Sequence, residues 1–569
     1  MAANSSDITP VLVVGAGPTG LTMACELARY GINLRLIDKS AHAAEQSRAL
    51  AVHARTLELF QDMGCVEPFL NAGLKLTSIS AFSEGKRFVH FRLDELDSAY
   101  PFSISIPQTD TEKLLAEHLK SFGKSPERSC ELVGLKQEKD HVVATVQKAD
   151  GTKEEIKAQW VVGCDGARSA VRKLQDIPFK GSQEEEIFLI ADVKVDWVDE
   201  EPDRLSAHDH PDGITAIFAM PEQRYRIICV VDPQSVWKDR KEPTLEEIRE
   251  MVKKRVPLIK DVSDPRWLTS FQVRYKQVPE YRYGRTFLCG DAAHIHSPMG
   301  GQGMNTGIQD AYNLAWKLAL VQQGLAKDIL LDSYQAERHA IAEALLKTTE
   351  FVTKVNITRN PLTRELRNRI APFLSAQEIV QQRARGFISE LEINYKRSPI
   401  VSEHRRSLVK VSTFGSGEAD MPTLGQWLEF GSGPKPGERA PDAVLTSPTK
   451  REPIRLYDLL VGTQHDLLVL TGDDAEGDVF KELIEFGNKA ASAFSKVLKV
   501  HMIAPTENAP AAMEKWTGDL YLDPEFSLHH KYGAGSECAY LIRPDGYIGF
   551  RCQPVDFAAL KSYFDQYLV

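Results

Sequence analysis

PVLVVGAGPTGLTMACELARYGINLRLID, residues 10–38, is the stretch of sequence that decides the fold. The apolar run 10–14 is typical of a buried strand, and the glycine-rich loop 15–20 opens a helix over residues 21–30. A second strand over residues 33–37 ends in an acid. This order of strand, loop, helix and strand predicts a βαβ unit that begins an α/β, Rossmann-like, dinucleotide-binding domain.

Each glycine of the loop has its own task in such a unit. Gly15 makes the tight turn, Gly17 lets a pyrophosphate approach the backbone, and Gly20 permits close packing of helix on strand. Pro18 and Thr19 lie between the last two glycines and start the helix. We therefore expect these five residues to bind a nucleotide.

Four residues beyond the loop are further candidates for binding the cofactor. Asp38 ends the second strand and can accept hydrogen bonds from an adenosine ribose, whereas it would repel the 2′-phosphate of NADP. Lys39 follows it directly. Arg48 can fork onto a pyrophosphate, although a solvated arginine at a helix start is an equal alternative. Gln108 can bond a ribityl or ribose oxygen.

GRTFLCGDAAHIHSPMGGQGMNTGIQDAYNLAW, residues 284–316, predicts another strand, loop and helix. The strand 286–288 runs into Gly290 and Asp291, glycines crowd the next loop, and a helix begins near Asn305. Unpaired N–H groups and the helix dipole favour an anionic group at such a site. The glycines let a flat ring approach the backbone without a side chain in between.

The pattern changes between these two units. Residues 160–169 form a strand that ends in Asp165 and Gly166 and then starts a helix. The strands that follow have no crossover helices between them, which predicts an antiparallel sheet that forms one wall of a pocket. These strands are expected at residues 187–197, 214–220, 224–231 and 268–274.

Composition narrows the function classes. The chain has 569 residues, 26% of them charged, and a formal net charge of −10, which argues against a nucleic-acid or anionic-membrane partner. No apolar run can span a bilayer, and residues 1–10 lack the regions of a signal peptide. The 8 cysteines show no Cys-x-x-Cys and no metal-ligand spacing, so we expect a cytoplasmic protein without a metal site.

Three motifs now stand in order along the chain: the loop 15–20 with Asp38, then Asp165-Gly166, then Gly290-Asp291. This set resembles the single-component FAD-dependent aromatic hydroxylases, the class A flavoprotein monooxygenases that include para-hydroxybenzoate hydroxylase and phenol hydroxylase. The resemblance covers roughly the first 400 residues. The C-terminal part resembles the thioredoxin-like domain appended to phenol hydroxylase, but it lacks a redox cysteine pair, so a structural or assembly role is expected.

The resemblance implies a domain plan. An FAD-binding domain is expected, with an inserted antiparallel-sheet substrate domain and a C-terminal thioredoxin-like α/β domain. The expected boundaries are residues 1–180 and 276–360 for FAD binding (with part of the substrate sheet near 76–108), 181–275 for the inserted sheet, 361–413 for a helical segment, 414–440 for a linker and 441–569 for the thioredoxin-like domain.

The resemblance also assigns roles to the motifs. The first motif would hold the adenosine and pyrophosphate of FAD, with contacts from Arg48 and Gln108. Asp165 and Gly166 form a second FAD motif that in the family also bears on NAD(P)H. Asp291 would bind the ribityl chain. The residues expected to line the isoalloxazine ring are Pro298, Gly301, Gly303, Met304 and Asn305.

The chemistry implied is hydroxylation of a phenolic or polycyclic aromatic compound. NADH or NADPH reduces FAD, O₂ adds at flavin C4a, and the distal oxygen of the hydroperoxide is transferred to the ring, next to Pro298. A phenol reacts better as phenolate, so a base near the ring is expected. The candidates are His208, His210 and Tyr225, although a position in a surface loop or in sheet packing is the favoured account of each.

Two other functions share these motifs. A related FAD oxidoreductase or epoxidase would act on a non-phenolic substrate. A weakly catalytic flavin-binding protein would use its C-terminal domain to bind a partner. The sequence leaves open the substrate, the choice of NADH or NADPH, and whether the chain forms a homodimer.

Overall fold

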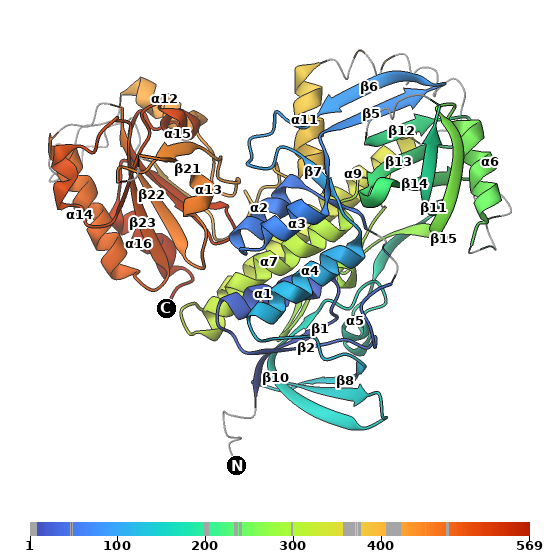
Figure 1. Ribbon diagram of the computed structural model, residues 1–569. Coiled ribbons are helices and arrows are strands. Elements are labelled where there is room, and N and C mark those ends of the chain that lie inside the picture. The colour runs from blue at the N-terminus through green and yellow to red at the C-terminus, as the bar shows by residue number, and fades with distance from the viewer. Residues whose placement is uncertain are drawn as a thin grey trace.

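The computed structural model describes residues 8–45, 47, 49–198, 204–232, 237, 240, 242–297, 300–356, 370, 373, 377–405, 423–449, 451–473 and 477–569. Within these residues the chain forms one seven-stranded sheet, two eight-stranded sheets and one three-stranded sheet. Figure 1 shows the sheet formed by the C-terminal part at one end of the molecule, the sheet backed by α6 at the other, and the helices α1, α4 and α7 between them.

The seven-stranded sheet is built from the βαβ unit that opens the chain. Its strands β2, β1, β10 and β17 are parallel neighbours in that order, and α1 (Pro18–Arg29) connects β1 to β2. Strands β9 and β16 add antiparallel edges, and β8 pairs with β9. The bounds are β1 Thr9–Val14, β2 Leu34–Ile37, β8 Cys130–Gln137, β9 Val142–Lys148, β10 Lys153–Gly163, β16 Arg282–Tyr283 and β17 Thr286–Leu288.

Helices α4 (Gln108–Ser121) and α7 (Gly303–Gln322) pack beside α1. α7 is buried from Asn305 to Leu320, because the small and apolar residues of this helix lie inside the main hydrophobic core. A three-stranded sheet of β3 (Ala51–Val52), β7 and β4 lies next to the loop that precedes α7. The other bounds here are β4 Leu74–Leu76, β7 Ser103–Ser105, α2 Ala54–Asp62, α3 Val66–Ala72 and α5 Ala170–Leu174.

The second large sheet has the strand order β18-β15-β11-β14-β13-β12-β5-β6. It therefore takes two strands from before residue 100 as well as those from 180 onward. Strand β12 pairs with β5 in parallel, whereas the other pairs are antiparallel. The bounds are β5 Ser78–Ser83, β6 Lys86–Arg92, β11 Lys180–Trp197, β12 Leu205–Asp209, β13 Thr215–Met220, β14 Arg224–Val231, β15 Ile259–Gln277 and β18 His294–Ile295.

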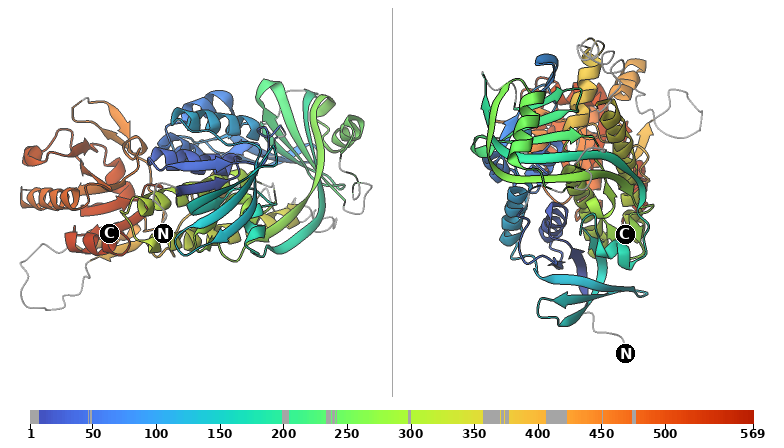
Figure 2. Two further views of the ribbon diagram at one scale, coloured as in Figure 1. Left: turned by 90° about the horizontal axis from the view of Figure 1, so that it is seen from below. Right: turned by 90° about the vertical axis from the view of Figure 1, so that its right-hand side faces the viewer.

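The two faces of this sheet have different surroundings. Helix α6 (Leu245–Arg255), which Thr244 and Glu247 cap reciprocally, covers one face through Ile248 and Val252. The opposite face carries the Asp192–Arg226 ion pair, and α9 packs against part of it. Figure 2 shows α6 on the outer side of the sheet.

The C-terminal sheet has the order β19-β26-β25-β22-β23-β24-β20-β21. Strands β22, β23 and β24 are parallel, and β25 and β26 form an antiparallel hairpin. The thioredoxin-like assignment stays a prediction. The bounds are β19 Ser402–Arg405, β20 Val444–Thr446, β21 Pro453–Arg455, α13 Leu456–Leu459, β22 His465–Gly472, α14 Gly477–Ala493, β23 Leu498–Ala504, β24 Asp519–Leu522, α15 Ser527–Tyr532, β25 Ser536–Ile542, β26 Ile548–Gln553 and α16 Phe557–Asp565.

The stretch expected to be a linker, 414–440, differs from that expectation in its described part. Residues 424–432 form helix α12 (Leu424–Ser432), because Thr423 and Gln426 make a capping box and Phe430 is buried in the core of the C-terminal sheet. Within the expected helical segment, β19 pairs with β26 and so extends the C-terminal sheet.

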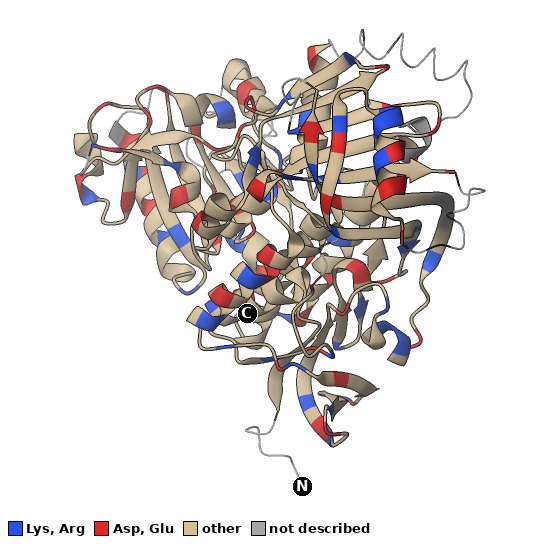
Figure 3. Ribbon diagram, turned by 45° about the vertical axis from the view of Figure 1, so that its right-hand side comes forward, with Lys and Arg blue, Asp and Glu red and all other residues tan. Residues whose placement is uncertain are grey.

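The chain from residue 328 to residue 356 is helical but is not one regular helix. A short 3-10 turn (Asp328–Leu331), α8 (Asp332–Tyr334) and a π-helical turn (Gln335–His339) precede α9 (Ala340–Asn356). Helix α11 (Glu378–Ser389) follows later in the chain. Of the described helices, none combines the length and the apolar character that crossing a bilayer needs. Figure 3 shows acidic and basic residues interspersed along the described ribbon.

Candidate active site

The three sequence motifs meet at one edge of the seven-stranded sheet. β1, β10 and β17 are parallel neighbours, with Val14 opposite Gly163 and Gly163 opposite Leu288. Gly15, Asp165 and Gly290 follow these strand ends within two residues. Ligands of open parallel sheets bind at the carboxyl ends of the strands. The topology therefore assembles in space what the sequence places about 275 residues apart.

The first loop has the steric properties that a pyrophosphate needs. Gly15 has φ +102°, and a Cβ there would lie 2.5 Å from the carbonyl oxygen of Cys164. A Cβ on Gly17 would meet no described residue within 4 Å other than its chain neighbours, so the backbone is open on that side. Pro18 begins α1, where its missing N–H costs no hydrogen bond. The loop is thus closed toward the sheet and open toward a ligand.

Thr19 joins the first motif to the third. A Cβ on Gly290 would lie 2.8 Å from Thr19 Oγ1, and one on Gly307 would lie 2.5 Å from the same atom. The turn before Asp291 and the first turns of α7 therefore pack around this one side chain. Only glycine at both positions leaves room for it.

Asp38, which follows the second strand, is held by backbone N–H groups on both sides. Asp38 is half-buried; its Oδ2 accepts from Ala16 N at 2.7 Å and its Oδ1 from Ser40 N at 2.8 Å. Arg128 approaches the same Oδ1 at 3.7 Å, while Lys39 is exposed. The carboxylate is thus anchored at the edge where a ribose would lie.

Gln108 has a structural partner that sequence reasoning did not foresee. Its Oε1 accepts from Ala49 N at 3.2 Å, and its Nε2 donates to Glu112 Oε1 at 2.8 Å. The Gln108 N–H donates to Ser47 Oγ at 2.7 Å. These contacts fix both residues that flank Arg48, which itself lies outside the described residues.

The second motif begins helix α5. Asp165 Oδ2 accepts from Ala170 N at 2.6 Å and from Val171 N at 3.2 Å. Its Oδ1 is buried and has no hydrogen-bond partner among the described residues, and burial raises the pKa of this carboxyl. Gly166 has φ +76° and open space around its Cβ position. The unpartnered oxygen fits a site that a ligand completes.

Arg172 connects the second and third motifs. Its Nη2 donates to Ala167 O at 2.7 Å, and its Nη1 donates to Ala292 O at 2.9 Å. The guanidinium is buried and stacks on Phe179. Sequence reasoning missed this residue, although its position seven residues after Asp165, inside the helix that the motif opens, is a usable signal.

The third motif is held by a buried acid. Asp291 is exposed at the strand end, and the preceding Gly290 donates its N–H to Asp310 Oδ2 at 3.0 Å. The same oxygen lies 2.7 Å from His294 Nε2. Arg338 Nε donates to Asp310 Oδ1 at 2.6 Å. His294 and the Gly290 N–H therefore share one oxygen of Asp310.

The glycine loop before α7 is fastened by Asn305 and His53. Asn305 Nδ2 donates to Ala51 O and Gly301 O, both at 2.9 Å, and its Oδ1 accepts from His53 N at 3.0 Å. The His53 ring bridges Ser103 Oγ at 2.9 Å and Gly300 O at 3.0 Å. Burial lowers the pKa of His53 to about 4, so the ring is neutral near pH 7.

Gly303 and Met304 start α7 and are half-buried. Their N–H groups lie in the first turn, where no intrahelical acceptor exists. Pro298 lies outside the described residues. Together the loop 300–305 and the α7 N-terminus form a cradle of backbone N–H groups that fits the electron-rich end of a flavin.

The candidate bases lie elsewhere on the second sheet. His208 pairs with Thr215 in the register and stacks on Phe82 at 4.8 Å, on the face that α6 covers; burial lowers its pKa to about 4. Tyr225 lies on that face too, against Trp197. His210 lies at the β12–β13 turn, near Asp212. The structure does not bring these three to the glycine loop.

Comparison with known proteins gives one family match. The model of the FAD binding domain family matches residues 8–349. Pentachlorophenol 4-monooxygenase of Sphingobium chlorophenolicum is 31% identical over 553 residues, which cover 95% of this chain and 93% of that protein. The 6-methylpretetramide 4-monooxygenase of Streptomyces rimosus is 31% identical and covers 96% of this chain and 91% of its own length.

A solved structure agrees with these sequence matches. The anhydrotetracycline hydroxylase of Streptomyces rimosus superposes with a TM-score of 0.72 at 28% identity. The match covers 98% of both chains, including the C-terminal sheet. These matches confirm the predicted resemblance to the FAD-dependent aromatic hydroxylases and the predicted α/β fold class, whereas the thioredoxin-like domain stays a prediction.

Proposed function

The chain belongs to the family of FAD-dependent aromatic monooxygenases, and from that premise we propose that it hydroxylates a flat, uncharged polycyclic aromatic compound with NADH or NADPH and O₂. The observation that carries the choice of substrate is a broad apolar surface on the second sheet. This surface lies on the face opposite α6, and Arg226 from the same face contacts Ala49 O beside the cofactor loops.

The apolar face, as we call this surface, is continuous across five neighbouring strands. Strand spacing of about 4.8 Å makes it roughly 19 Å wide, well beyond a single aromatic ring. The register places its members side by side, and every one is half-buried. They are Ile79, Ala81, Val89, Phe91, Leu205, Ala207, Ala216, Phe218 and Ile228.

Charge on this face supports an uncharged substrate. Arg226 makes a two-pronged contact with Asp192, with both hydrogen bonds at 2.7 Å. Arg224 of the same strand pairs with Asp264 at 2.7 Å. A guanidinium already bound by a carboxylate is a poor receptor for a substrate carboxylate. This favours a polycyclic ring system as the substrate and disfavours a small hydroxybenzoic acid.

The residues described above have defined tasks in this reaction. Bound FAD accepts electrons from NAD(P)H and supplies the activated oxygen. The first turn of α7 stabilises negative charge at the flavin through its unpaired N–H groups. The apolar face excludes water, which would otherwise divert the oxygen to H₂O₂. Asn305 and His53 keep the glycine loop in place.

The test is the rate of flavin reduction by NADH and NADPH, measured without and with aromatic compounds. The panel contains single-ring phenols, hydroxybenzoic acids and phenolic compounds of three or four fused rings. We expect a fused-ring compound to accelerate flavin reduction markedly. One molecule of hydroxylated product should form for each O₂ consumed. Acceleration by a hydroxybenzoic acid alone would contradict the assignment of the apolar face.

We also propose that the chain forms a homodimer and that the protein is cytoplasmic. Size-exclusion chromatography with light scattering tests the first. Neither depends on the substrate.

A further inference from the structure

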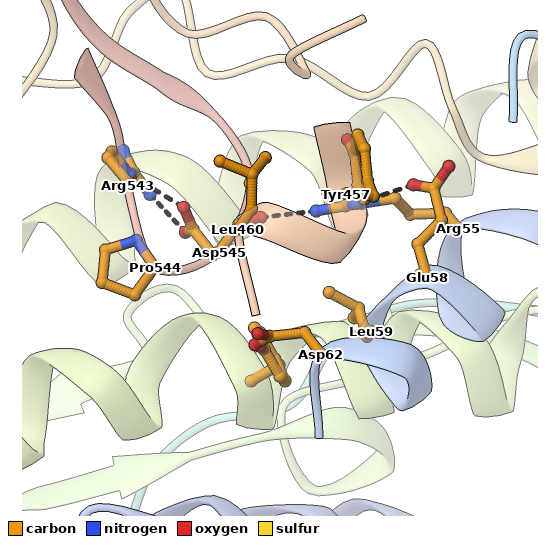
Figure 4. Close-up of a pocket in the computed structure, with 11 residues that line it drawn as sticks. Arg55, Glu58, Leu59, Asp62, Tyr457, Leu460, Arg543, Pro544 and Asp545 are labelled. Carbon is orange, nitrogen blue, oxygen red and sulfur yellow. Dashed lines mark hydrogen bonds and ion pairs between the residues drawn. The ribbon is translucent and has the colours of Figure 1, made fainter. Parts of the chain in front are cut away.

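A turn of the C-terminal sheet reaches the side of α7. The turn, residues 543–546, connects β25 to β26 (Figure 4). Asp545 Oδ2 accepts from Asn313 Nδ2 at 3.1 Å and from Trp316 Nε1 at 3.2 Å. The Asp545 carbonyl accepts from Arg55 of α2. The turn thus contacts the helix whose first residues form the cradle for the flavin.

Arg543 of the same turn binds a buried glutamate of the flavin domain. Its two terminal nitrogens donate to Glu337 Oε1 and Oε2 at 2.6 and 2.9 Å, and Nη2 also donates to Asp545 Oδ2 at 2.5 Å. Lys317 Nζ of α7 donates to Glu337 Oε2 at 2.6 Å. The side chains of Arg543, Lys317 and Glu337 are 0% exposed.

The next residue continues the contact toward the site. Arg338 follows Glu337 in the π-helical turn, a form that recurs at functional sites. It donates to Asp310 Oδ1, as above, and its Nη2 donates to Thr306 O at 3.1 Å, in the first turns of α7. Asp310 in turn holds the Gly290 N–H beside Asp291.

These contacts use one stripe of α7. Thr306, Asp310, Asn313 and Lys317 have the spacing i, i+4, i+7 and i+11, which places them on one face of a helix. The ion pairs join three acids to three bases, so the buried formal charges cancel. Buried charges of this kind depend on their partners, since loss of one leaves another uncompensated.

We propose that the turn 543–546 positions the loop 300–305 and the first turns of α7, where the flavin is expected to bind. Arg543 and Asp545 hold Glu337 and α7 so that the adjacent Arg338 fixes Asp310, the Gly290 turn and the start of α7 in the geometry that FAD requires. The proposal rests on FAD binding alone and does not depend on the substrate. It gives the C-terminal sheet a role in the chemistry of the flavin domain without any redox cysteine.

The experiment compares full-length variants for FAD affinity and for the midpoint potential of bound FAD. Arg543→Met removes the link to Glu337, and Asp545→Asn removes its charge at constant volume. Arg551→Met is the matched control, because Arg551 is equally buried in β26 and, among the described residues, its hydrogen bonds all go to the C-terminal part, including Phe430 O at 2.9 Å and Glu403 Oε1 at 2.9 Å. Circular dichroism establishes that each variant is folded.

We expect Arg543→Met and Asp545→Asn to raise the Kd for FAD about 2- to 30-fold, the usual range for coupling through packed networks, and to shift the midpoint potential. Arg543→Lys, which retains the charge beside Glu337, restores part of the affinity. Arg551→Met lowers the unfolding temperature but leaves Kd and potential unchanged.

Two results would overturn the proposal. One is a Kd and potential for folded Asp545→Asn that match those of the wild type; this variant decides the matter if Arg543→Met fails to fold. The other is an equal change in Arg551→Met, which would reduce the effect to general destabilisation of the C-terminal sheet.

Discussion

A Cβ atom on Gly20 would lie 1.8 Å from the carbonyl oxygen of Gly15, whereas one on Gly17, between them, would meet no other described residue within 4 Å beyond its chain neighbours. The two substitutions therefore have different consequences. Gly20→Ala forces α1 away from the sheet, and we expect loss of folded protein. Gly17→Ala leaves the apoprotein folded but intrudes on the pyrophosphate, and we expect much weaker FAD binding. Thermal unfolding and FAD titration of both apoproteins check this; equal unfolding temperatures would contradict it.

Replacing Asp291 with Ala weakens FAD retention, because the exposed carboxylate at the strand end is expected to bind the ribityl chain. Hydrogen bonds to charged groups contribute about 1.5–3 kcal/mol, so the Kd rises roughly 10- to 100-fold. Glu131→Ala, an exposed acid on β8, is the charge-matched control. The measurement is flavin occupancy after gel filtration, and full occupancy in Asp291→Ala would refute the assigned role.

His53→Phe removes both ring contacts of a buried histidine. Gly300 O and Ser103 Oγ lose their partner, which costs about 1–3 kcal/mol of unfolding free energy, and the glycine loop loosens. We expect a lower unfolding temperature together with weaker FAD binding. His42→Phe, at an exposed position, should change neither quantity.

Glu390 predicts a pH effect of definite sign. Burial raises the pKa of this carboxyl, which contacts Gln309 of α7, from 4.5 to about 8. Between these values the folded state holds a proton that the unfolded state has lost, so the contribution of Glu390 to stability falls as pH rises from about 4.5 to about 8. Glu390→Gln should gain stability relative to the wild type across this window and not below it. Chemical unfolding at pH 4.5, 6 and 8 tests the sign.

Ala216→Leu adds volume in the middle of the apolar face, between Ala207 and Ile228. We expect a higher Kd for a fused-ring substrate with unchanged FAD occupancy, because the site of the change is on the substrate side of the sheet. Spectral titration of the bound flavin measures both. An unchanged substrate Kd would place the substrate elsewhere.

The sequence was informative where local rules suffice. Strand, glycine loop and helix follow from periodicity and from glycines that no other residue can replace, so the three motifs and their strands were predictable. The parallel pairing of β12 with β5 was not, since Ser206 and Ser80 lie 126 residues apart and no local pattern encodes their register. The candidate bases His208, His210 and Tyr225 do not lie at the glycine loop for a related reason. Alternation along a strand defines two faces but does not indicate which face is turned toward the cofactor.

The sequence of α7 contains an indication of its buried polar stripe. Asp310 and Lys317 are charged residues seven positions apart in a helix that is otherwise uncharged, and buried charges require partners. Their partners, Glu337, Arg338 and Arg543, come from distant segments, so the sequence could have indicated a network but not its members.

The second large sheet takes β5 and β6 from residues 78–92 and β11 to β15 from residues 180–277. A chimaera that exchanges only residues 180–277 with a relative would therefore pair a foreign β12 with a native β5. The apolar face would then combine side chains from two proteins that bind different substrates. Recombination aimed at a new substrate must exchange residues 78–92 together with residues 180–277. The unit of inheritance for specificity in this scaffold is thus discontinuous in sequence, although it is a single surface in space.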